Sequence, residues 1–123
     1  MSVNIDVVPK YEAVDKYRDE IWKDIIGSKT YQVSNYGRVK NKITDYILKP
    51  QLLSETYYGV RVDINGITKT VRIHCLVTEA FLGPRPYKYD INHIDGNKLN
   101  NRLDNLEYCS KSDNVRHAYK TGL

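Results

Sequence analysis

The chain has 123 residues, a length that suits one compact domain or a small catalytic module fused to a short accessory module. No apolar run approaches the roughly 18 residues needed to cross a bilayer, and the amino terminus does not read as a signal peptide, so we expect a cytoplasmic protein without a membrane partner. The formal net charge of +4 favours a polyanionic partner but is too modest to identify one.

The two cysteines, Cys75 and Cys109, argue against a structural zinc site. Neither belongs to a Cys-x-x-Cys pair or has a second cysteine close by in the sequence. Both lie in apolar stretches, where a buried reduced thiol is the commoner state, although the sequence alone leaves one disulfide open. We therefore predict no structural zinc.

The first part of the chain predicts a small basic hairpin. Residues 1–20 show no clear pattern and are left as an unassigned extension, whose protein partner is unknown. Residues 31–33 and 38–40 are predicted to form two short strands around an Asn/Gly turn at residues 34–37. Two basic residues, Arg38 and Lys40, lie on this hairpin.

A second hairpin is predicted over residues 58–73. Asn65-Gly66 supplies the two residues with positive φ that a type I′ turn requires. This turn places Ile64 opposite Ile67, Val60 opposite Val71 and Tyr58 opposite Ile73 on an apolar face. The polar face, which is available to phosphate, carries Arg61, Thr70 and Arg72.

An amphipathic helix is predicted after this hairpin. Its apolar residues follow helical spacing, and they are Ile73, Leu76, Val77, Ala80 and Phe81. Gly83-Pro84 would end the helix. We interpret it as a scaffold helix, and His74 within it as a scaffold histidine.

The last third of the chain predicts the order strand, loop, strand, helix. Residues 90–94 and 106–109 are predicted as strands, with a turn at residues 95–97. Ser110, followed three residues later by Asp113, resembles a helix capping box, so a final helix is expected from Ser110. The predicted fold class is α+β, with amino-terminal antiparallel β-hairpins, a scaffold helix and this last unit.

The polar residues between Ile91 and His117 resemble the HNH motif of the ββα-metal nucleases. In that family a histidine ends the first strand, an asparagine lies in the loop, and a histidine or asparagine projects from the helix. The matching residues here are His93, Asn105 and Asn114, with His117 one helical turn further.

The resemblance extends towards the amino terminus. Residues 72–81 are similar to the helix ahead of the motif in phage and intron-encoded HNH homing endonucleases, and residues 22–39 resemble their nuclease-associated modular DNA-binding domain. We therefore predict an extension at 1–20, a modular DNA-binding segment at 21–56, and an HNH nuclease domain with its preceding hairpin and helix at 57–123. A phage or mobile-element origin in a bacterial host is expected.

The resemblance implies a role for each residue of the motif. His93 would be the general base, because histidine exchanges a proton near neutral pH. Asn92 and Asn114 would hold one divalent ion, and hard oxygen ligands indicate Mg²⁺ or Mn²⁺. Asn105 would brace the loop that holds His93. His117 would either contact the scissile phosphate or cap a helix face.

One residue departs from the pattern of many HNH nucleases, which carry Asp or His directly before the general base. Here that residue is the neutral Asn92, so a lower metal affinity is expected. Asp95 is another nearby carboxylate, but a turn-forming role suits it better.

The implied partner is double-stranded DNA, and the implied reaction is metal-dependent hydrolysis of a phosphodiester. One such site nicks one strand, so a homodimer or two successive events would be needed to break both. The metal-bearing helix of this fold class approaches the minor groove. The basic residues predicted to contact DNA are Arg38, Lys40, Arg61, Arg72, Arg102, Lys111 and Arg116.

Two other functions stay open from the sequence. A catalytically weak or inactive HNH-fold DNA-binding protein is suggested by Asn92. A protein-binding regulator acting through residues 1–20 would lose a partner, but no nuclease activity, when that extension is deleted.

Overall fold

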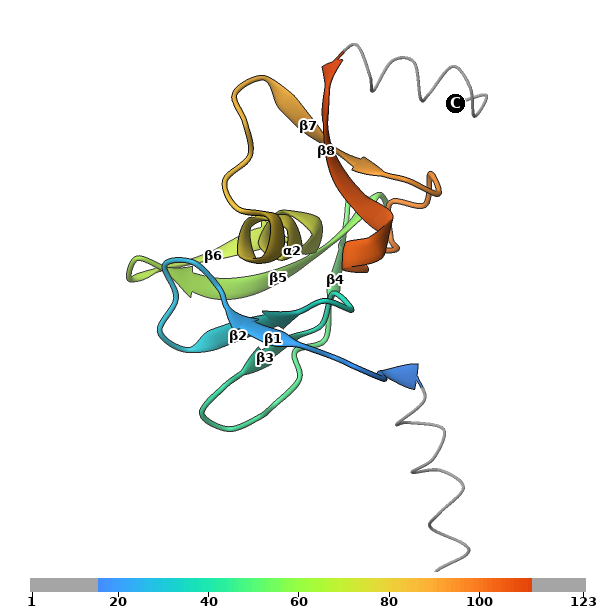
Figure 1. Ribbon diagram of the computed structural model, residues 1–123. Helices are drawn as coiled ribbons and strands as arrows, with labels where there is room; N and C mark the ends of the chain where they lie inside the picture. The colour runs from blue at the N-terminus through green and yellow to red at the C-terminus, as the bar shows by residue number, and fades with distance from the viewer. Residues whose placement is uncertain (1–15, 112–123) are drawn as a thin grey trace, which may run out of the picture.

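The computed structural model describes residues 16–111 (Figure 1). Its sheets are antiparallel, and the predicted α+β class is confirmed. The elements in chain order are β1 (Trp22–Asp24), β2 (Tyr31–Ser34), β3 (Val39–Asn41), β4 (Gln51–Leu53), β5 (Tyr57–Ile64), β6 (Ile67–Arg72), α2 (Ile73–Leu82), β7 (Tyr89–His93), the 3-10 helix η1 (Leu103–Asn105) and β8 (Leu106–Ser110).

The first sheet has the order β1-β2-β3 and confirms the predicted amino-terminal hairpin. In the turn between β2 and β3, the Ser34 hydroxyl accepts hydrogen bonds from the Tyr36 and Arg38 amides, and Gly37 has a φ of 83°. The strand β1 was not predicted. None of its three residues is buried, and unlike β3 it does not follow an Asn/Gly turn that would mark it as a strand.

The second sheet has the order β4-β5-β6 and contains the predicted Asn-Gly hairpin. Asn65 and Gly66 have φ values of 52° and 82°, as a type I′ turn requires. The predicted pairing of Val60 with Val71 is confirmed. Tyr58 pairs with Leu52 of β4, not with residue 73, because the chain has already turned into α2 there.

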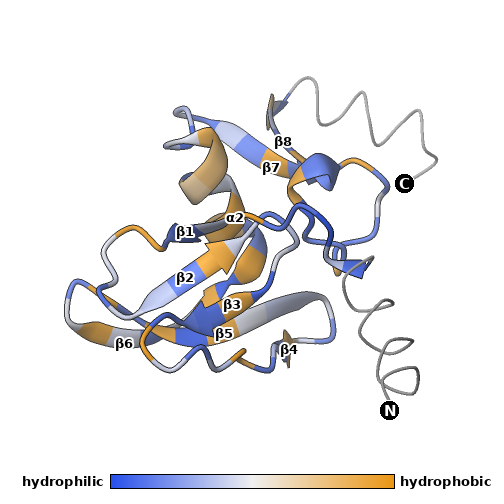
Figure 2. Cartoon of the chain, turned by 60° about the horizontal axis from the view of Figure 1, so that its bottom comes forward, coloured by the Kyte–Doolittle hydropathy of each residue, from blue (hydrophilic) through white to orange (hydrophobic). Residues whose placement is uncertain are grey.

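The helix α2 runs over the predicted residues, ends at Gly83, and lies at the centre of the molecule. It contacts β1, β2, β5, β6, β7 and β8 (Figure 1), and most of its length is hydrophobic in Figure 2. One hydrophobic core therefore joins the first two sheets, the helix and β8. Its buried residues are Ile25, Val33, Val39, Val60, Val62, Ile73, Leu76, Val77 and Leu106.

The two family segments predicted from the sequence share this core. The predicted boundary between residues 56 and 57 falls at the turn that joins two paired strands, β4 and β5. Burying one Val or Ile side chain stabilises a fold by about 1.5–3 kcal/mol. Each segment thus depends on the other for part of its burial.

The third sheet pairs β7 with β8, close to the strands predicted there. Asn92 lies opposite Glu107, and His93 opposite Leu106. Ser110, the predicted cap of the final helix, is the last residue of β8. The remaining residues predicted on that helix, Asp113, Asn114, Arg116 and His117, lie outside the described residues.

Two further observations concern the predicted class of protein. Cys75 and Cys109 are both thiols, and Cys109 is buried. Between residues 16 and 111, no helix has the length and apolar character to cross a membrane.

Candidate active site

The loop between β7 and η1 is braced by the side chain of Asn105. The Asn105 amide nitrogen donates to an Asp95 carboxylate oxygen at 3.0 Å and to the Asn100 carbonyl at 2.9 Å, and its oxygen accepts from the Asp95 amide at 3.0 Å. Hydrogen bonds from Asn100 and from the Asn97 amide hold the pKa of Asp95 below its usual range. Asp95 therefore has the turn-forming role that the sequence suggested.

The His93 imidazole is buried at the end of β7, and its Nε2 lies 3.0 Å from Oδ1 of Asn101. An amide oxygen can only accept a hydrogen bond, so Nε2 carries the proton and Nδ1 is left as the acceptor. Asn101 is itself buried, with 6% of its surface exposed. The loop thus presents His93 in the tautomer that can take up a proton at Nδ1.

The Asn101 backbone rests against the amino-terminal sheet. A Cβ atom at Gly37 would lie 2.8 Å from the Asn101 carbonyl oxygen, so this close approach requires glycine at position 37. The Leu103 amide donates to the Asn35 carbonyl at 2.9 Å. The turn between β2 and β3 therefore supports the residue that contacts His93.

Two aromatic rings lie beside His93. The ring centres of His74 and His93 are 5.2 Å apart at nearly a right angle, and the Tyr57 ring lies 5.0 Å from His74 and 6.4 Å from His93. Burial, followed by the charges of His93, Arg72 and Arg85, lowers the pKa of His74 to about 4. His74 is therefore neutral at physiological pH, and its Nδ1 is buried with no hydrogen-bond partner among residues 16–111.

Two cations lie over the Tyr57 ring. The guanidinium carbon of Arg72 is 4.6 Å from the ring centre, and Lys98 Nζ is 5.5 Å from it. These residues come from the start of β5, the end of β6 and the loop after β7. The Tyr57 ring therefore lies close to two positively charged side chains and to the imidazole rings of His74 and His93.

Asn92 is also buried, and its amide is oriented by a neighbour across the sheet. The amide nitrogen donates to Oε2 of Glu107 at 2.8 Å. Amide and carboxylate oxygens are the ligands that Mg²⁺ and Mn²⁺ prefer, so the donor set fits such an ion. No three His, Cys, Asp or Glu side chains gather into a metal-binding group between residues 16 and 111. Substrate oxygens and water would complete the coordination of a bound ion.

The predicted DNA-contacting residues lie in different environments. Arg38 donates from Nε and Nη2 to Glu20 at 2.9 and 2.5 Å, and its guanidinium lies 3.7 Å from the Tyr17 ring centre. Arg102 is bonded to Asp104 at 3.2 Å and lies over Tyr36. These two side chains are held by neighbours on the protein.

Three of the other predicted contacts are exposed, and Lys40 is only partly exposed. Arg61 is exposed and donates to the Thr70 hydroxyl at 3.4 Å, while Arg72 and Lys111 are exposed as well. Lys40 contacts Asp45 at 3.4 Å and lies over the Trp22 ring. Arg116, like Asn114 and His117, lies outside the described residues.

The structure therefore brings Asn92, His93 and Asn105 to one end of the β7-β8 sheet and the loop that follows β7. Four further residues join them that the sequence analysis did not single out for this site: Tyr57, Lys98, Asn101 and Glu107. The spacing of Asn101, eight residues after His93 in a turn-rich loop, was the one available signal. The others depend on strand register and on contacts between distant parts of the chain.

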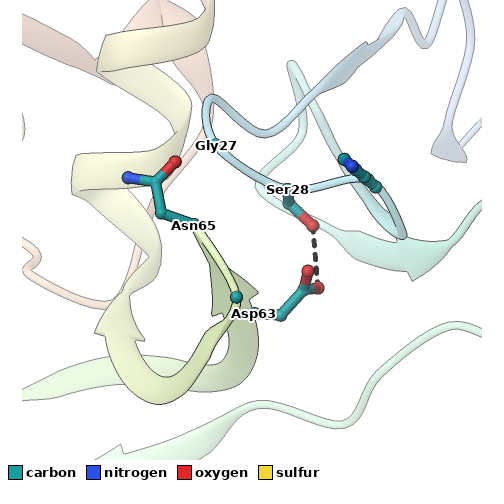
Figure 3. Close-up of a pocket in the computed structure, with 6 residues that line it drawn as sticks. Gly27, Ser28, Asp63 and Asn65 are labelled. Atoms are coloured by element: carbon teal, nitrogen blue, oxygen red, sulfur yellow. Dashed lines mark hydrogen bonds between the residues drawn. The ribbon is translucent and has the colours of Figure 1, made fainter.

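A separate hollow of about 590 Å³ lies between the β1-β2 turn and the tip of the β5-β6 hairpin (Figure 3). The Ser28 hydroxyl donates to Asp63 at 3.0 Å, and the Asn65 amide donates to the Gly27 carbonyl at 2.8 Å. These bonds fasten the first sheet to the second. None of the predicted site residues lines this hollow.

Comparison with known proteins shows which protein families the two segments of the chain match. Residues 71–116 match the family model described as HNH endonuclease, a span that includes His93, Asn101 and Asn105. Residues 71–116 therefore carry the HNH pattern that the sequence predicted. Residues 20–63 match the NUMOD4 motif, so the predicted order of an associated module followed by an HNH domain is confirmed.

The chain is related to viral HNH endonucleases. It is 34% identical to the DNA endonuclease I-HmuI of Bacillus phage SP01 over 102 residues, covering 82% of this chain and 59% of that protein. It is 42% identical over 113 residues to the uncharacterized HNH endonuclease L247 of Acanthamoeba polyphaga mimivirus, covering 86% of this chain and 28% of that protein. It thus spans less than two thirds of either relative.

A solved structure supports the same relationship. The structure titled "DNA binding and cleavage by the HNH homing endonuclease I-HmuI" matches with a TM-score of 0.73 at 34% identity, covering 83% of this chain and 59% of that chain. The predicted resemblance to phage HNH homing endonucleases is confirmed.

Proposed function

We propose that the chain is a metal-dependent DNA endonuclease that hydrolyses one phosphodiester bond per active site. The observation that carries this proposal is the buried His93, whose Nε2 is bonded to Asn101 so that Nδ1 can accept a proton. The names of the relatives, a DNA endonuclease and a structure of DNA binding and cleavage, support the same activity.

In the proposed mechanism, His93 Nδ1 takes a proton from the attacking water molecule. The bond from Nε2 to Asn101 fixes the ring orientation during this transfer and stabilises the imidazolium that forms. Asn92 and Asn114 would hold one Mg²⁺ or Mn²⁺ ion, which supplies positive charge to the transition state and the leaving oxygen. His117 would contact the scissile phosphate.

Contacts to double-stranded DNA would come from the more open cations. Arg72 and Lys98, which lie over the Tyr57 ring near His93, would bind the phosphate that is cleaved or its neighbour. Arg61 lies on the polar face of the same hairpin. A monomer would nick one strand, and a homodimer would be required for a double-strand break. A phage-encoded chain would act in the cytoplasm of its bacterial host.

A plasmid nicking assay with Mg²⁺ or Mn²⁺ tests the proposal. Wild-type protein should convert supercoiled plasmid to the open circle, and His93→Ala should lower the rate at least about a hundredfold, since positioned acid-base catalysis contributes 10²–10⁴-fold. Thr68→Ala, a change on the exposed hairpin face, is the matched control and should cleave as wild type does. Cleavage by His93→Ala at the wild-type rate would remove this histidine from the mechanism.

The second candidate is an HNH-fold protein that binds DNA without efficient cleavage. The neutral Asn92 favours it, because a carboxylate at this position would bind a divalent ion more strongly. Wild-type protein that shifts a DNA duplex in a gel but leaves the plasmid supercoiled in both Mg²⁺ and Mn²⁺ would establish this alternative.

A further inference from the structure

The polarity of the hydrogen bond between Asn92 and Glu107 determines what Asn92 can offer to a ligand. The bond uses the amide nitrogen of Asn92 and Oε2 of Glu107, which lies directly opposite on β8. With its nitrogen turned to the carboxylate, the carboxamide presents its oxygen Oδ1 in another direction. The Glu107 carboxylate thereby selects the orientation in which Asn92 can bind a cation.

We propose that Glu107 is a positioning residue for the metal ligand Asn92, and that the two side chains together replace the single carboxylate found before the general base in many HNH nucleases. This inference rests on the proposed function, because it requires Asn92 to bind the divalent ion. It assigns to Glu107 a role that neither the HNH motif nor the sequence pattern contains.

Two physical effects favour this pairing. An amide that donates its N–H to a carboxylate carries more electron density on its oxygen, which strengthens that oxygen as a ligand. The carboxylate also places a full negative charge beside the ligand, where a neutral asparagine alone would leave the ion with less compensation. Asn92 is only 8% exposed, whereas Glu107 is exposed, so water screens part of this charge and reduces its effect on the ion.

If the pair of Asn92 and Glu107 only stabilises the hairpin, a different result is expected. Opposite side chains on paired strands stabilise a hairpin by about 0.2–1 kcal/mol whatever their function. A change at Glu107 would then lower the melting temperature slightly and leave ion binding unaltered. Measurement of ion affinity therefore separates the two readings.

The test measures Mn²⁺ binding to the complete chain by titration calorimetry and by the Mn²⁺ paramagnetic resonance signal, without DNA. Glu107→Gln keeps the size of the side chain but removes its charge, and should weaken Mn²⁺ binding about tenfold or more. Glu79→Gln, the same change on an exposed helix residue, is the matched control and should bind as wild type does.

A charge swap sharpens the test. In the double variant Asn92→Asp with Glu107→Gln, the carboxylate moves to position 92 and accepts a hydrogen bond from the glutamine amide. Net charge and pairing are preserved, so Mn²⁺ affinity should return to within about threefold of wild type. A melting curve of each variant confirms that it is folded under the conditions of the titration.

The outcomes are distinct. Mn²⁺ affinity unchanged in Glu107→Gln, or not restored by the charge swap, overturns the role of Glu107. If wild type binds Mn²⁺ and Asn114→Ala weakens it while Glu107→Gln does not, this inference fails and the proposed metal site stands. If wild type binds no Mn²⁺ even with a DNA duplex present, the proposed metal-dependent function fails as well.

Discussion

At the scale of single residues, the contact between His93 and Asn101 determines which ring nitrogen can act. The sequence motif indicated Asn105 as the residue that supports His93. In the structure, Asn105 braces the loop through Asp95 and Asn100, and Asn101 holds the imidazole directly. The support is therefore divided between an asparagine that shapes the loop and one that orients the ring.

We predict that Asn101→Leu lowers the rate constant of plasmid nicking about 10- to 100-fold, because Nε2 loses its acceptor and the ring can adopt the other tautomer. Asn101→Asp keeps an acceptor and should retain most of the rate. Single-turnover nicking at saturating protein measures the effect on the chemical step. Equal rates for Asn101→Leu and wild type would show that the hydrogen bond does not orient His93.

The second residue-scale prediction concerns pH and His74. The pKa of His74 lies at about 4 in the folded protein against 6.5 for an unperturbed histidine, because the ring is buried near His93, Arg72 and Arg85. As pH falls below about 6.5, the unfolded chain takes up a proton at this residue and the folded protein does not, so the folded state loses stability down to about pH 4.

We expect this loss to be on the order of 2 kcal/mol between pH 7 and pH 4. Urea unfolding of wild type and of His74→Phe across this range measures it. Phenylalanine keeps an aromatic ring against Tyr57 and has no proton to gain, so the stability of the variant should fall less steeply. Parallel pH profiles for the two proteins would contradict the assignment.

At the scale of elements, the turn between β2 and β3 connects the amino-terminal sheet to the loop that carries Asn101. Gly37 has positive φ and lies against the Asn101 backbone. A side chain at this position faces two costs, the strain of the backbone conformation and a collision with the carbonyl oxygen. At Gly66, the strain of the backbone conformation can be measured without a collision, because nothing lies within 4 Å of an added Cβ atom.

We predict that Gly37→Ala destabilises the protein by about 2–4 kcal/mol and also lowers the nicking rate, because Asn101 must shift away from His93. The matched control is Gly66→Ala, which has nearly the same φ and open space around its Cβ, so only the strain of about 1–2 kcal/mol applies. Urea unfolding and plasmid nicking are measured for both. If the two substitutions lowered stability and nicking rate equally, the contact between Gly37 and Asn101 would contribute to neither.

At the scale of the whole molecule, the features with strong local signals were predicted from the sequence. The Asn65-Gly66 turn fixes a hairpin by its two positive φ values, and the periodic apolar residues of α2 mark a helix whose end is set by Gly83. His93 was identified by the residues around it in the HNH motif. In each case the determining interactions lie within a few residues of each other.

The features that were not predicted depend on distant parts of the chain. Glu107 meets Asn92 only because β7 and β8 pair in one register, and Tyr57 reaches His74 and His93 from the start of another strand. Arg38 was predicted as a DNA contact, but the sequence does not reveal that Glu20 binds its guanidinium. Such contacts follow from the fold, which a pattern of residue types does not contain.

The shared hydrophobic core has a consequence for how such genes can recombine. Val33 and Val39 of the NUMOD4 segment pack in the same cluster as Leu76 and Val77 of the HNH segment. A crossover that replaced only the first segment would set foreign side chains against this helix and leave voids or overlaps in the interior. Exchange without loss of packing would require the matching helix face to be transferred with the first segment, so the two segments, each with its own family model, form one packing unit.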